Sequence, residues 1–337
     1  MTKLIIQIPC YNEAQALPET LAALPRSVPG FDAVEVLVID DGSTDETSRV
    51  AREHGADHVI RLNGHQGLAR AFMAALDAAI EQGADVIVNT DADNQYCGED
   101  IASLAAPILK READIVIGAR PIQSMGHFSP LKRWLQRLGS RVVRSLSNTE
   151  IADAPSGFRA MTRDAALRLN VFGDYTYTLE TIIQAGRSNL RIVNVPVRVN
   201  GPTRPSRLMR STSQYVGRSL LTLLSVYLIY RPTRIFNALA AAFLAPATIL
   251  AARYIVLAFQ GQGTGHVQSV IAAGVLGVCG VFMFSIGIVA HLLAINRRLL
   301  EQIRYLERAR QAARPRGRRA MDPPEIITRP VEVERVN

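Results

Sequence analysis

The sequence predicts an α/β domain followed by an interfacial helix and two membrane-spanning helices. Two observations support this architecture. Short apolar runs alternate with amphipathic stretches over residues 1–200, whereas two long stretches between 235 and 295 carry almost no charge. The chain has 337 residues, of which 48% are hydrophobic and 20% charged. This length allows one large or two ordinary domains, and the composition excludes a disordered, collagen-like or disulfide-rich chain.

The strands of the α/β domain are predicted from short, continuous apolar runs, as in a parallel sheet covered on both faces. These runs occupy residues 4–8, 34–39, 58–62, 85–90, 114–118 and, later, 190–199. The amphipathic helices between them lie near residues 14–23, 44–54, 67–82 and 99–111. Strands that alternate with helices at this spacing predict a doubly wound, Rossmann-like domain, which binds ligands at the carboxyl ends of its strands.

The two C-terminal stretches are long enough to cross a membrane. Residues 235–259 contain one charged residue, Arg253, and residues 267–295 contain no Lys, Arg, Asp or Glu. Since about 20 apolar residues span a bilayer core, both are predicted membrane helices rather than buried helices of a soluble protein. Residues 211–234 are too polar at their start to span, and they are predicted to form an amphipathic interfacial helix.

Positive charge lies at both ends of this predicted hairpin, 235–295. Arg231 and Arg234 precede it, Arg297 and Arg298 follow it, and the connection at 260–266 has no Lys or Arg. The positive-inside rule therefore predicts a multi-pass protein of the plasma (inner) membrane, with the α/β domain and both termini cytoplasmic.

The net charge of +8 is concentrated near the C-terminus. Residues 297–319 hold nine Arg and two Glu, so the rest of the chain is nearly neutral and nucleic acid is not an expected partner. The segment 296–319 is predicted to be a cytoplasmic helix that either touches anionic lipid or is simply solvated. Residues 320–337 are predicted to be disordered. The three cysteines form no C-x-x-C pair, and their odd number argues against a disulfide framework.

Polar clusters follow three predicted strands: PCYNE (9–13), DDGSTDET (40–47) and DADNQ (91–95). Asp91 and Asp93 flank one alanine in the turn after a strand, where both can converge on one cation. Hard oxygen ligands suit Mg²⁺ or Mn²⁺ bridging a diphosphate, and the chain has no Walker A sequence to hold phosphates by backbone amides. The cluster therefore predicts a metal-dependent diphosphate site.

Asp40 and Asp41 allow two interpretations. One of them can point into the cleft and accept hydrogen bonds from a base or a ribose. Alternatively, they belong to a plain helix-entry turn, since Gly42, Ser43 and Asp45 are also turn and cap residues. The chemistry of these residues leaves both interpretations open.

Taken together, these clusters, GAR (118–120) and DAPSGFR (153–159) resemble the family 2 glycosyltransferases with a GT-A fold. The most similar branch looks like dolichol-phosphate mannose synthase and its bacterial polyprenyl-phosphate relatives with two C-terminal membrane helices. The resemblance covers roughly residues 3–300, with the GT-A domain at 1–210. It implies a metal-dependent, inverting transfer of a sugar from a nucleotide-sugar to an undecaprenyl- or dolichyl-type phosphate at the cytoplasmic face.

The resemblance also implies roles for individual residues of the matched motifs. The nucleotide-sugar pocket would contain Pro9, Tyr11, Glu13, Asp40 with its neighbour Asp41, Asp91 and Ala92. The catalytic residues would be Asp93, Gln95, Arg120 and Asp153, with Asp91 and Asp93 as metal ligands. The family's usual N-x-G-x-G segment reads NGHQG at 63–67, a departure at His65 and Gln66 that bears on sugar or base specificity.

The acceptor's chemistry predicts a cluster of arginines. A phosphate monoester is largely dianionic at neutral pH, so it needs positive charge rather than a general base. Arg204, Arg207 and Arg210 lie between the last strand and the interfacial helix, and Arg159 is a further candidate. A hydroxyl acceptor would instead need a base, for which Asp153 is the best candidate.

Other functions are alternatives. A glycosyltransferase of this kind could act on another lipid or on a hydroxyl acceptor. A processive polysaccharide synthase agrees less well, because LKRW (131–134) has Pro130 where the Q-x-x-R-W motif has Gln. A non-catalytic membrane scaffold would have no need of Asp91, Asp93 and Gln95. The expected partners are a nucleotide-sugar, a polyprenyl phosphate and the membrane, and a homo-oligomer is compatible with the sequence.

Overall fold

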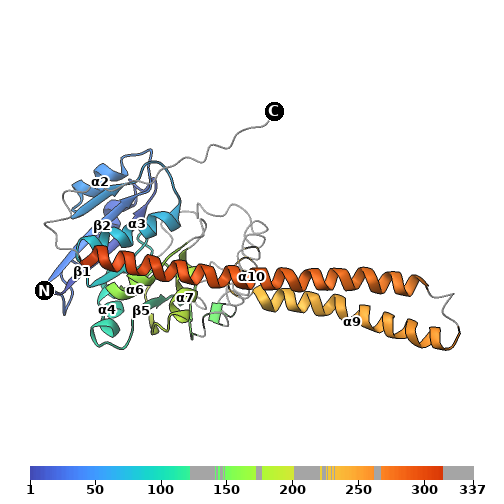
Figure 1. Cartoon of the computed structure of the whole chain (residues 1–337). Helices are drawn as coiled ribbons and strands as arrows, with labels where there is room; N and C mark the ends of the chain where they lie inside the picture. Colours follow the sequence, from blue (N-terminus) through green and yellow to red (C-terminus); the bar gives the residue numbers. More distant parts are fainter. Residues whose placement is uncertain are drawn as a thin grey trace.

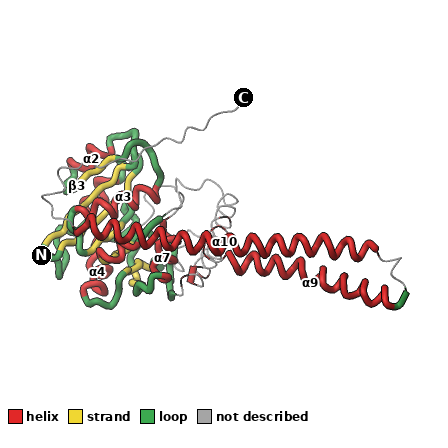
Figure 2. The backbone as a smooth tube through the Cα atoms, viewed as in Figure 1, coloured by secondary structure: helices red, strands yellow, loops and turns green. Residues whose placement is uncertain are grey.

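The computed structural model describes residues 1–121, 149–171, 177–200, 232–261 and 267–313, with a few single positions between 141 and 147 and between 221 and 230. These residues form an α/β domain from which a long helical hairpin projects (Figures 1 and 2). Most of the predicted interfacial helix at 211–234 and the whole tail at 320–337 lie outside the described residues.

Strands and helices alternate along the first part of the chain, as the sequence predicts. The strands are β1 (Lys3–Cys10), β2 (Ala33–Asp40), β3 (His58–Arg61), β4 (Val86–Asn89), β5 (Ile115–Ala119), β6 (Arg159–Thr162) and β7 (Ile192–Pro196). The helices of the domain are α1 (Leu17–Ala23), α2 (Thr47–Glu53), α3 (Leu68–Glu81), α4 (Ile101–Leu109), α6 (Arg163–Arg168) and α7 (Tyr177–Arg187), with a 3₁₀ turn, η1 (Gly98–Asp100), before α4.

The strands form one sheet in the order β3-β2-β1-β4-β6-β5-β7. Neighbouring strands are parallel except that β6 runs antiparallel to both β4 and β5. The sheet of the predicted α/β domain is therefore mixed, with one antiparallel strand among parallel ones. The four residues of β6, RAMT, form no apolar run, so hydrophobic patterning could not detect them. The antiparallel pairing places Arg159 opposite Asn89, and so brings the segment 153–158 to the edge where β4 ends.

The sheet separates two apolar cores, because successive side chains of a strand point to opposite faces. In β1, Ile5 packs with α3, α6 and α7, whereas Leu4 and Ile6 pack with α1, α2 and α4. On the first face, Phe72 of α3 stacks on Tyr177 of α7 with 3.9 Å between ring centroids. With both faces covered by helices, ligand-binding side chains are expected on the loops that leave the edges of the sheet.

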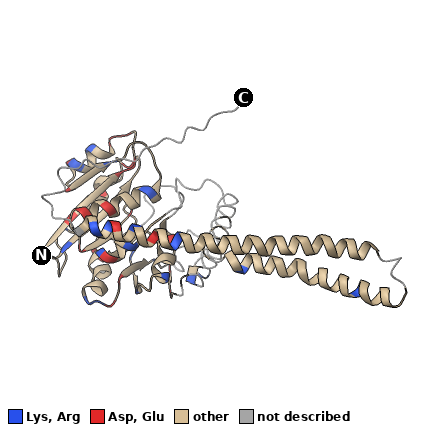
Figure 3. Ribbon diagram, viewed as in Figure 1, with Lys and Arg blue, Asp and Glu red and all other residues tan. Residues whose placement is uncertain are grey.

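The hairpin consists of α9 (Pro232–Phe259) and α10 (Val267–Ala313). Both helices are long and apolar enough to cross a membrane, and the protein buries few of their side chains. Charged residues are sparse along the projecting part (Figure 3). The two helices pack closely at Gly280, where a Cβ atom would lie 2.5 Å from Leu244 Cγ. The helix α10 passes the predicted boundary near residue 295 and continues to Ala313 as one helix of 47 residues.

Candidate active site

Three polar clusters meet at one edge of the sheet. The strands β1, β2 and β4 are neighbours and run parallel, so residues 11–13, 41–45 and 91–95 leave the same edge. Asn12 joins two of these segments, because its N–H donates to Ser43 Oγ (2.9 Å) and its Oδ1 accepts from the Thr44 N–H (2.8 Å). The prediction that the clusters share the carboxyl-terminal edge is confirmed.

Asp91 and Asp93 lie in the turn that follows β4. The Thr20 hydroxyl of α1 donates to Ala92 O (2.8 Å), which holds the buried middle of the turn. Gln95 donates its backbone N–H and its side-chain amide to the Asp93 carboxylate, at 3.2 and 2.8 Å. In this structure Gln95 therefore orients Asp93, and Ala92 supports the turn from within.

The environment of Asp91 disfavours negative charge. Burial, and then the charge of Asp93, raise the pKa of Asp91 to about 6, although Arg120 and Arg159 act in the opposite direction. A divalent cation beside the two carboxylates would remove this penalty. Among the described residues, no group of three or more His, Cys, Asp or Glu could enclose a metal ion. The two carboxylates therefore fit a cation that completes its shell with substrate phosphates and water, as Mg²⁺ commonly does.

Asp40 and Asp41 are buried anchors for the loops around the site. Asp40 is fully buried and accepts the Ser43 N–H at 2.8 Å. Asp41 accepts the N–H groups of Gln66 (2.8 Å) and Gly67 (2.9 Å), which fastens the loop before α3. Of the two interpretations of these aspartates, the structure supports the turn, and it does not expose Asp40 to a base.

One accessible feature of this region is an aromatic pair. Tyr11, which is 37% exposed, stacks on His65 with 3.9 Å between ring centroids and 23° between ring planes. His65 Nδ1 lies 2.8 Å from Asp41 Oδ2, and this contact holds the imidazole against Tyr11. Pro9 and Glu13, also expected in the pocket, are buried. The family resemblance implies a place for Tyr11 in the pocket, but no sequence pattern predicts the stack, whose flat surface suits a planar ligand.

Arg120 and Asp153 form a bidentate ion pair across the site. The Nε–Oδ2 and Nη2–Oδ1 distances are 2.7 and 3.0 Å, and Asp153 is 1% exposed. Both carboxylate oxygens of Asp153 are thus committed to one guanidinium. This geometry suits an aspartate that orients Arg120 better than one that removes a proton from a substrate.

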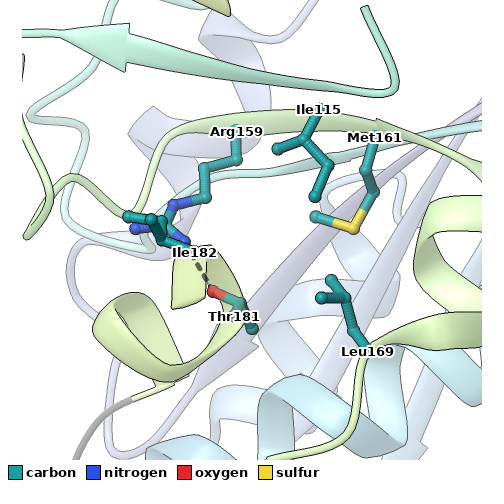
Figure 4. Close-up of a pocket in the computed structure, with 6 residues that line it drawn as sticks. All are labelled: Ile115, Arg159, Met161, Leu169, Thr181 and Ile182. Carbon is teal, nitrogen blue, oxygen red and sulfur yellow. Dashed lines mark hydrogen bonds between the residues drawn. The ribbon is translucent and has the colours of Figure 1, made fainter. Parts of the chain in front are cut away.

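Arg159 lies in the interior of the domain, contrary to the expectation that it is available to a lipid phosphate. Its guanidinium donates to Ser156 O (2.8 Å), Ala154 O (2.8 Å) and Thr181 Oγ1 (2.7 Å), and the residue is 1% exposed. Figure 4 shows its side chain at one end of a small closed pocket that is otherwise lined mainly by apolar side chains. The sequence could not reveal this, because the strand that buries Arg159 has no apolar signature. Arg159 instead fixes the backbone of 154–156.

A buried amide network sets the position of this backbone against Asp91. Gln7 donates to Asn89 Oδ1 (2.9 Å), and Asn89 Nδ2 donates to Gly157 O (2.8 Å) and to Tyr177 Oη (3.0 Å). No motif in the sequence marks Gln7 or Asn89 as functional. The available signal was that each is a polar residue inside an otherwise apolar strand that is covered on both faces.

Asn200, the last described residue before the predicted acceptor arginines in the sequence, is bonded to the turn of the site. The Asn200 backbone N–H donates to Gln95 O (2.9 Å), and its side-chain amide donates to Asn94 O (2.8 Å). Arg204, Arg207 and Arg210 lie outside the described residues. Arg204 nevertheless follows Asn200 by four residues, which an extended chain spans in at most about 14 Å.

Comparisons with known proteins match about half to two thirds of the chain. The family model described as glycosyl transferase family 2 matches residues 5–169. The undecaprenyl-phosphate mannosyltransferase of Micrococcus luteus is 32% identical over 200 residues, which cover 56% of this chain and 80% of that protein. The UDP-N-acetylglucosamine–dolichyl-phosphate N-acetylglucosaminyltransferase of Methanococcus voltae is 29% identical over 216 residues, or 57% and 83% of the two chains.

A solved structure shares the fold. Glucosyl-3-phosphoglycerate synthase from Mycobacterium tuberculosis, in complex with Mn²⁺, uridine diphosphate and phosphoglyceric acid, superposes with a TM-score of 0.51. The identity is 20%, and the match covers 66% of this chain and 78% of that one. At this identity the likeness establishes the architecture of the α/β domain.

Replacing Gly157 with alanine is expected to displace Asp91. A Cβ atom there would lie 2.9 Å from Asp91 Oδ1 and 3.0 Å from Tyr177 Oη. Because one neighbour must move, we expect Mn²⁺ affinity, measured by paramagnetic resonance titration, to fall at least about tenfold, the equivalent of about 1.4 kcal/mol. Gly274→Ala is the control, since a Cβ there meets nothing within 4 Å. Wild-type affinity in a folded Gly157→Ala protein would contradict this geometry.

Proposed function

Because the chain belongs to glycosyltransferase family 2, we propose that this enzyme, whose α/β domain has the GT-A fold, transfers one sugar from a nucleotide-sugar to a polyprenyl phosphate. Two relatives support the acceptor: the enzymes from M. luteus and M. voltae are named for different sugars, but both names specify a polyprenyl-type phosphate. The acceptor is thus the shared element, and the proposal leaves the sugar and the nucleotide open.

One observation carries the proposal. Asn200, bonded to the turn that holds Asp93, leads the chain into the segment with Arg204, Arg207 and Arg210, and that segment leads to the apolar hairpin. Such an order of elements suits an acceptor that is a phosphate at one end and a long hydrocarbon at the other.

The proposed reaction is a displacement at the anomeric carbon of the sugar. An oxygen of the lipid phosphate forms the new C–O bond, while the bond to the nucleoside diphosphate breaks and its electron pair leaves with the diphosphate. No proton has to move, because the phosphate nucleophile is already dianionic. Arg204, Arg207 and Arg210 would bind this phosphate and screen it from the donor's negative charge.

Asp91 and Asp93 are the proposed ligands of Mg²⁺ or Mn²⁺. When bound, the ion would neutralise the donor diphosphate and stabilise it as a leaving group. Gln95 holds Asp93 in place, and Arg120, fixed by Asp153, adds positive charge near Asp91. Tyr11 and His65 would meet the base of the donor.

A hydroxyl acceptor is the alternative, and it would need a general base. Asp153 was the best candidate, but its carboxylate is buried and paired with Arg120. Removing a proton would require this ion pair to break, so the geometry favours the phosphate acceptor.

We propose that the α/β domain and both termini are cytoplasmic, where nucleotide-sugars are available, with the hairpin connection outside. The charge asymmetry around α9 and α10 supports this orientation. A cysteine in place of Gln262 should therefore react with an impermeant thiol reagent in intact cells, whereas a cysteine in place of Thr44 should react only after lysis. Labelling of the Thr44→Cys variant in intact cells would reverse the proposed orientation.

Asp93→Ala is expected to reduce transfer by at least about 100-fold, because the loss of a metal ligand removes several kcal/mol of charge stabilisation. Chelation of divalent cations should have the same effect on the unmodified enzyme, and added Mn²⁺ should restore it. Glu112→Ala, an exposed acidic residue at the opposite edge, is the matched control. Full activity in the presence of a chelator would contradict the assignment of Asp91 and Asp93 as metal ligands.

Two variants distinguish the phosphate from the hydroxyl acceptor. Arg207→Ala should raise the apparent KM for the lipid about ten- to a hundredfold, since a charge-assisted bond contributes about 1.5–3 kcal/mol, and should change the KM for the nucleotide-sugar much less. Arg207→Lys should rescue it partly. Asp153→Asn should retain measurable turnover. An inactive Asp153→Asn together with normal lipid affinity in Arg207→Ala would establish the hydroxyl mechanism instead.

A further inference from the structure

The last part of α10, residues 297–313, lies against the α/β domain instead of standing free in solvent (Figures 1 and 3). Its contacting residues recur every three or four positions and so share one face of the helix. Arg297 contacts Glu180 of α7, Arg304 contacts Asn170, and the Tyr305 hydroxyl donates to Asp164 Oδ1 at 3.0 Å. We call residues 297–313 the docked segment.

Arg308 is a more enclosed contact of the docked segment than Arg297. Its Nη1 donates to the carbonyl oxygens of Ala166 (3.1 Å), Leu167 (3.1 Å) and Leu169 (2.9 Å), where α6 ends, and its Nη2 contacts the Asp77 carboxylate of α3. The last carbonyls of a helix lack intrahelical partners and carry partial negative charge. Since the Arg308 side chain is only 10% exposed, one guanidinium ties α10 to two helices of the domain.

These contacts differ from both expectations for the basic segment, which were contact with anionic lipid and simple solvation. Arg297, Arg304 and Arg308 all use their guanidinium groups on the domain. Arg310 belongs to the same helix but is exposed and lies about 200° around the axis from Arg308. The positive charge on the described part of the segment thus serves, for these three arginines, to fasten the helix to protein.

The docked segment also has a direction relative to the sheet. Near its end, Ala312 O accepts from Arg163, which also donates to Ala84 O just before β4 begins. At its start, Arg297 contacts Glu180, in the first turn of α7, the helix whose Tyr177 accepts from Asn89 at the end of β4. The helix therefore runs opposite to β4, and the edge that carries Asp91 lies at the end from which α10 continues into the hairpin.

We propose that the docked segment is a rigid strut that sets the height and orientation of the active edge above the bilayer. The active edge is the edge of the sheet that carries Asp91 and Asp93. Arg308 is then a positioning residue for the use of a membrane-embedded acceptor. This inference rests on the proposed function. A lipid phosphate stays at the depth of the head groups, so the domain must hold its active edge there. One unbroken helix from the second span to the back of the domain fixes that geometry, whereas a flexible linker would spread it over many heights.

The kinetic test compares two acceptors in the full-length protein reconstituted in vesicles. One acceptor is a long-chain polyprenyl phosphate in the bilayer, and the other is a short-chain, water-soluble isoprenyl phosphate. Arg308→Ala should raise the apparent KM for the long-chain acceptor about tenfold or more and leave kinetics with the soluble acceptor and the nucleotide-sugar within about twofold. Arg308→Lys should rescue part of the loss, because lysine retains the charge but not the forked set of bonds.

Arg310→Ala is the matched control, because it removes the same charge from the exposed side of the same helix. It should behave as the unmodified enzyme. If Arg310→Ala and Arg308→Ala raise the apparent KM for the long-chain acceptor equally, attraction to lipid rather than docking is responsible and the strut is refuted. If Arg308→Ala loses activity equally with both acceptors and has a lower thermal unfolding midpoint, the role of Arg308 is purely structural and the proposal fails. Unchanged kinetics in Arg308→Ala would also overturn the proposal.

A distance measurement tests the strut without reference to catalysis. A donor dye on a cysteine replacing Glu112, exposed just before β5 at the edge away from the hairpin, reports its separation from acceptor-labelled head groups. The strut requires one narrow distance distribution that becomes broader in Arg308→Ala and not in Arg310→Ala. If the enzyme modified neither isoprenyl phosphate, the proposed function would fail, while unchanged distances in Arg308→Ala would refute the strut itself.

Discussion

The arrangement of the active edge depends on the side-chain amide of Asn89. This group is buried in the middle of the sheet, where an unpaired amide is costly, so its partners must be present whenever the domain is folded. Through them it joins Gln7 of β1 to Gly157 and to Tyr177 of α7. Asp91 follows Asn89 by two residues, so the same bonds set the distance between the first carboxylate and the segment opposite it.

Several charged groups around the site are held by partners within the domain. Asp40 and Asp41 bond to loop N–H groups, Asp153 pairs with Arg120, and Arg159 is held by two backbone carbonyls and a threonine hydroxyl. Buried charges persist only with such partners, because desolvation is otherwise too costly. Asp91 and Asp93, the second of which is held by Gln95, repel each other, and a cation would relieve this repulsion. Charge on the described side of the site is therefore concentrated where a donor diphosphate and its metal would lie.

The proposed nucleotide-sugar comes from water and the proposed acceptor from the membrane, and a different part of the fold would meet each of them. Loops at the ends of parallel strands, pinned by buried carboxylates, present Tyr11 and His65 toward the aqueous side. The proposed route to the membrane is the pair of apolar helices α9 and α10, since only a fully hydrogen-bonded helix or a closed barrel can enter a bilayer. The helix α10 continues from the apolar hairpin onto α3, α6 and α7. It therefore connects the hairpin to the α/β domain without a flexible joint, and the arginines on its docked face make the contacts.

Local patterns in the chain are enough to predict the parallel part of the α/β domain, the two apolar helices and the position of Asp91 and Asp93 after a strand. Each of these follows from hydrophobic patterning or turn chemistry within a short stretch of chain. Other features become visible only in the folded protein. The strand β6 is antiparallel and buries Arg159, Asp40 and Asp41 anchor loops, and Asp153 is held by Arg120. The docked face of α10 binds the domain through Arg297, Arg304 and Arg308. The physical reason is that a charged side chain takes the partner that folding brings to it, and those partners lie tens to hundreds of residues away, where no local pattern records them.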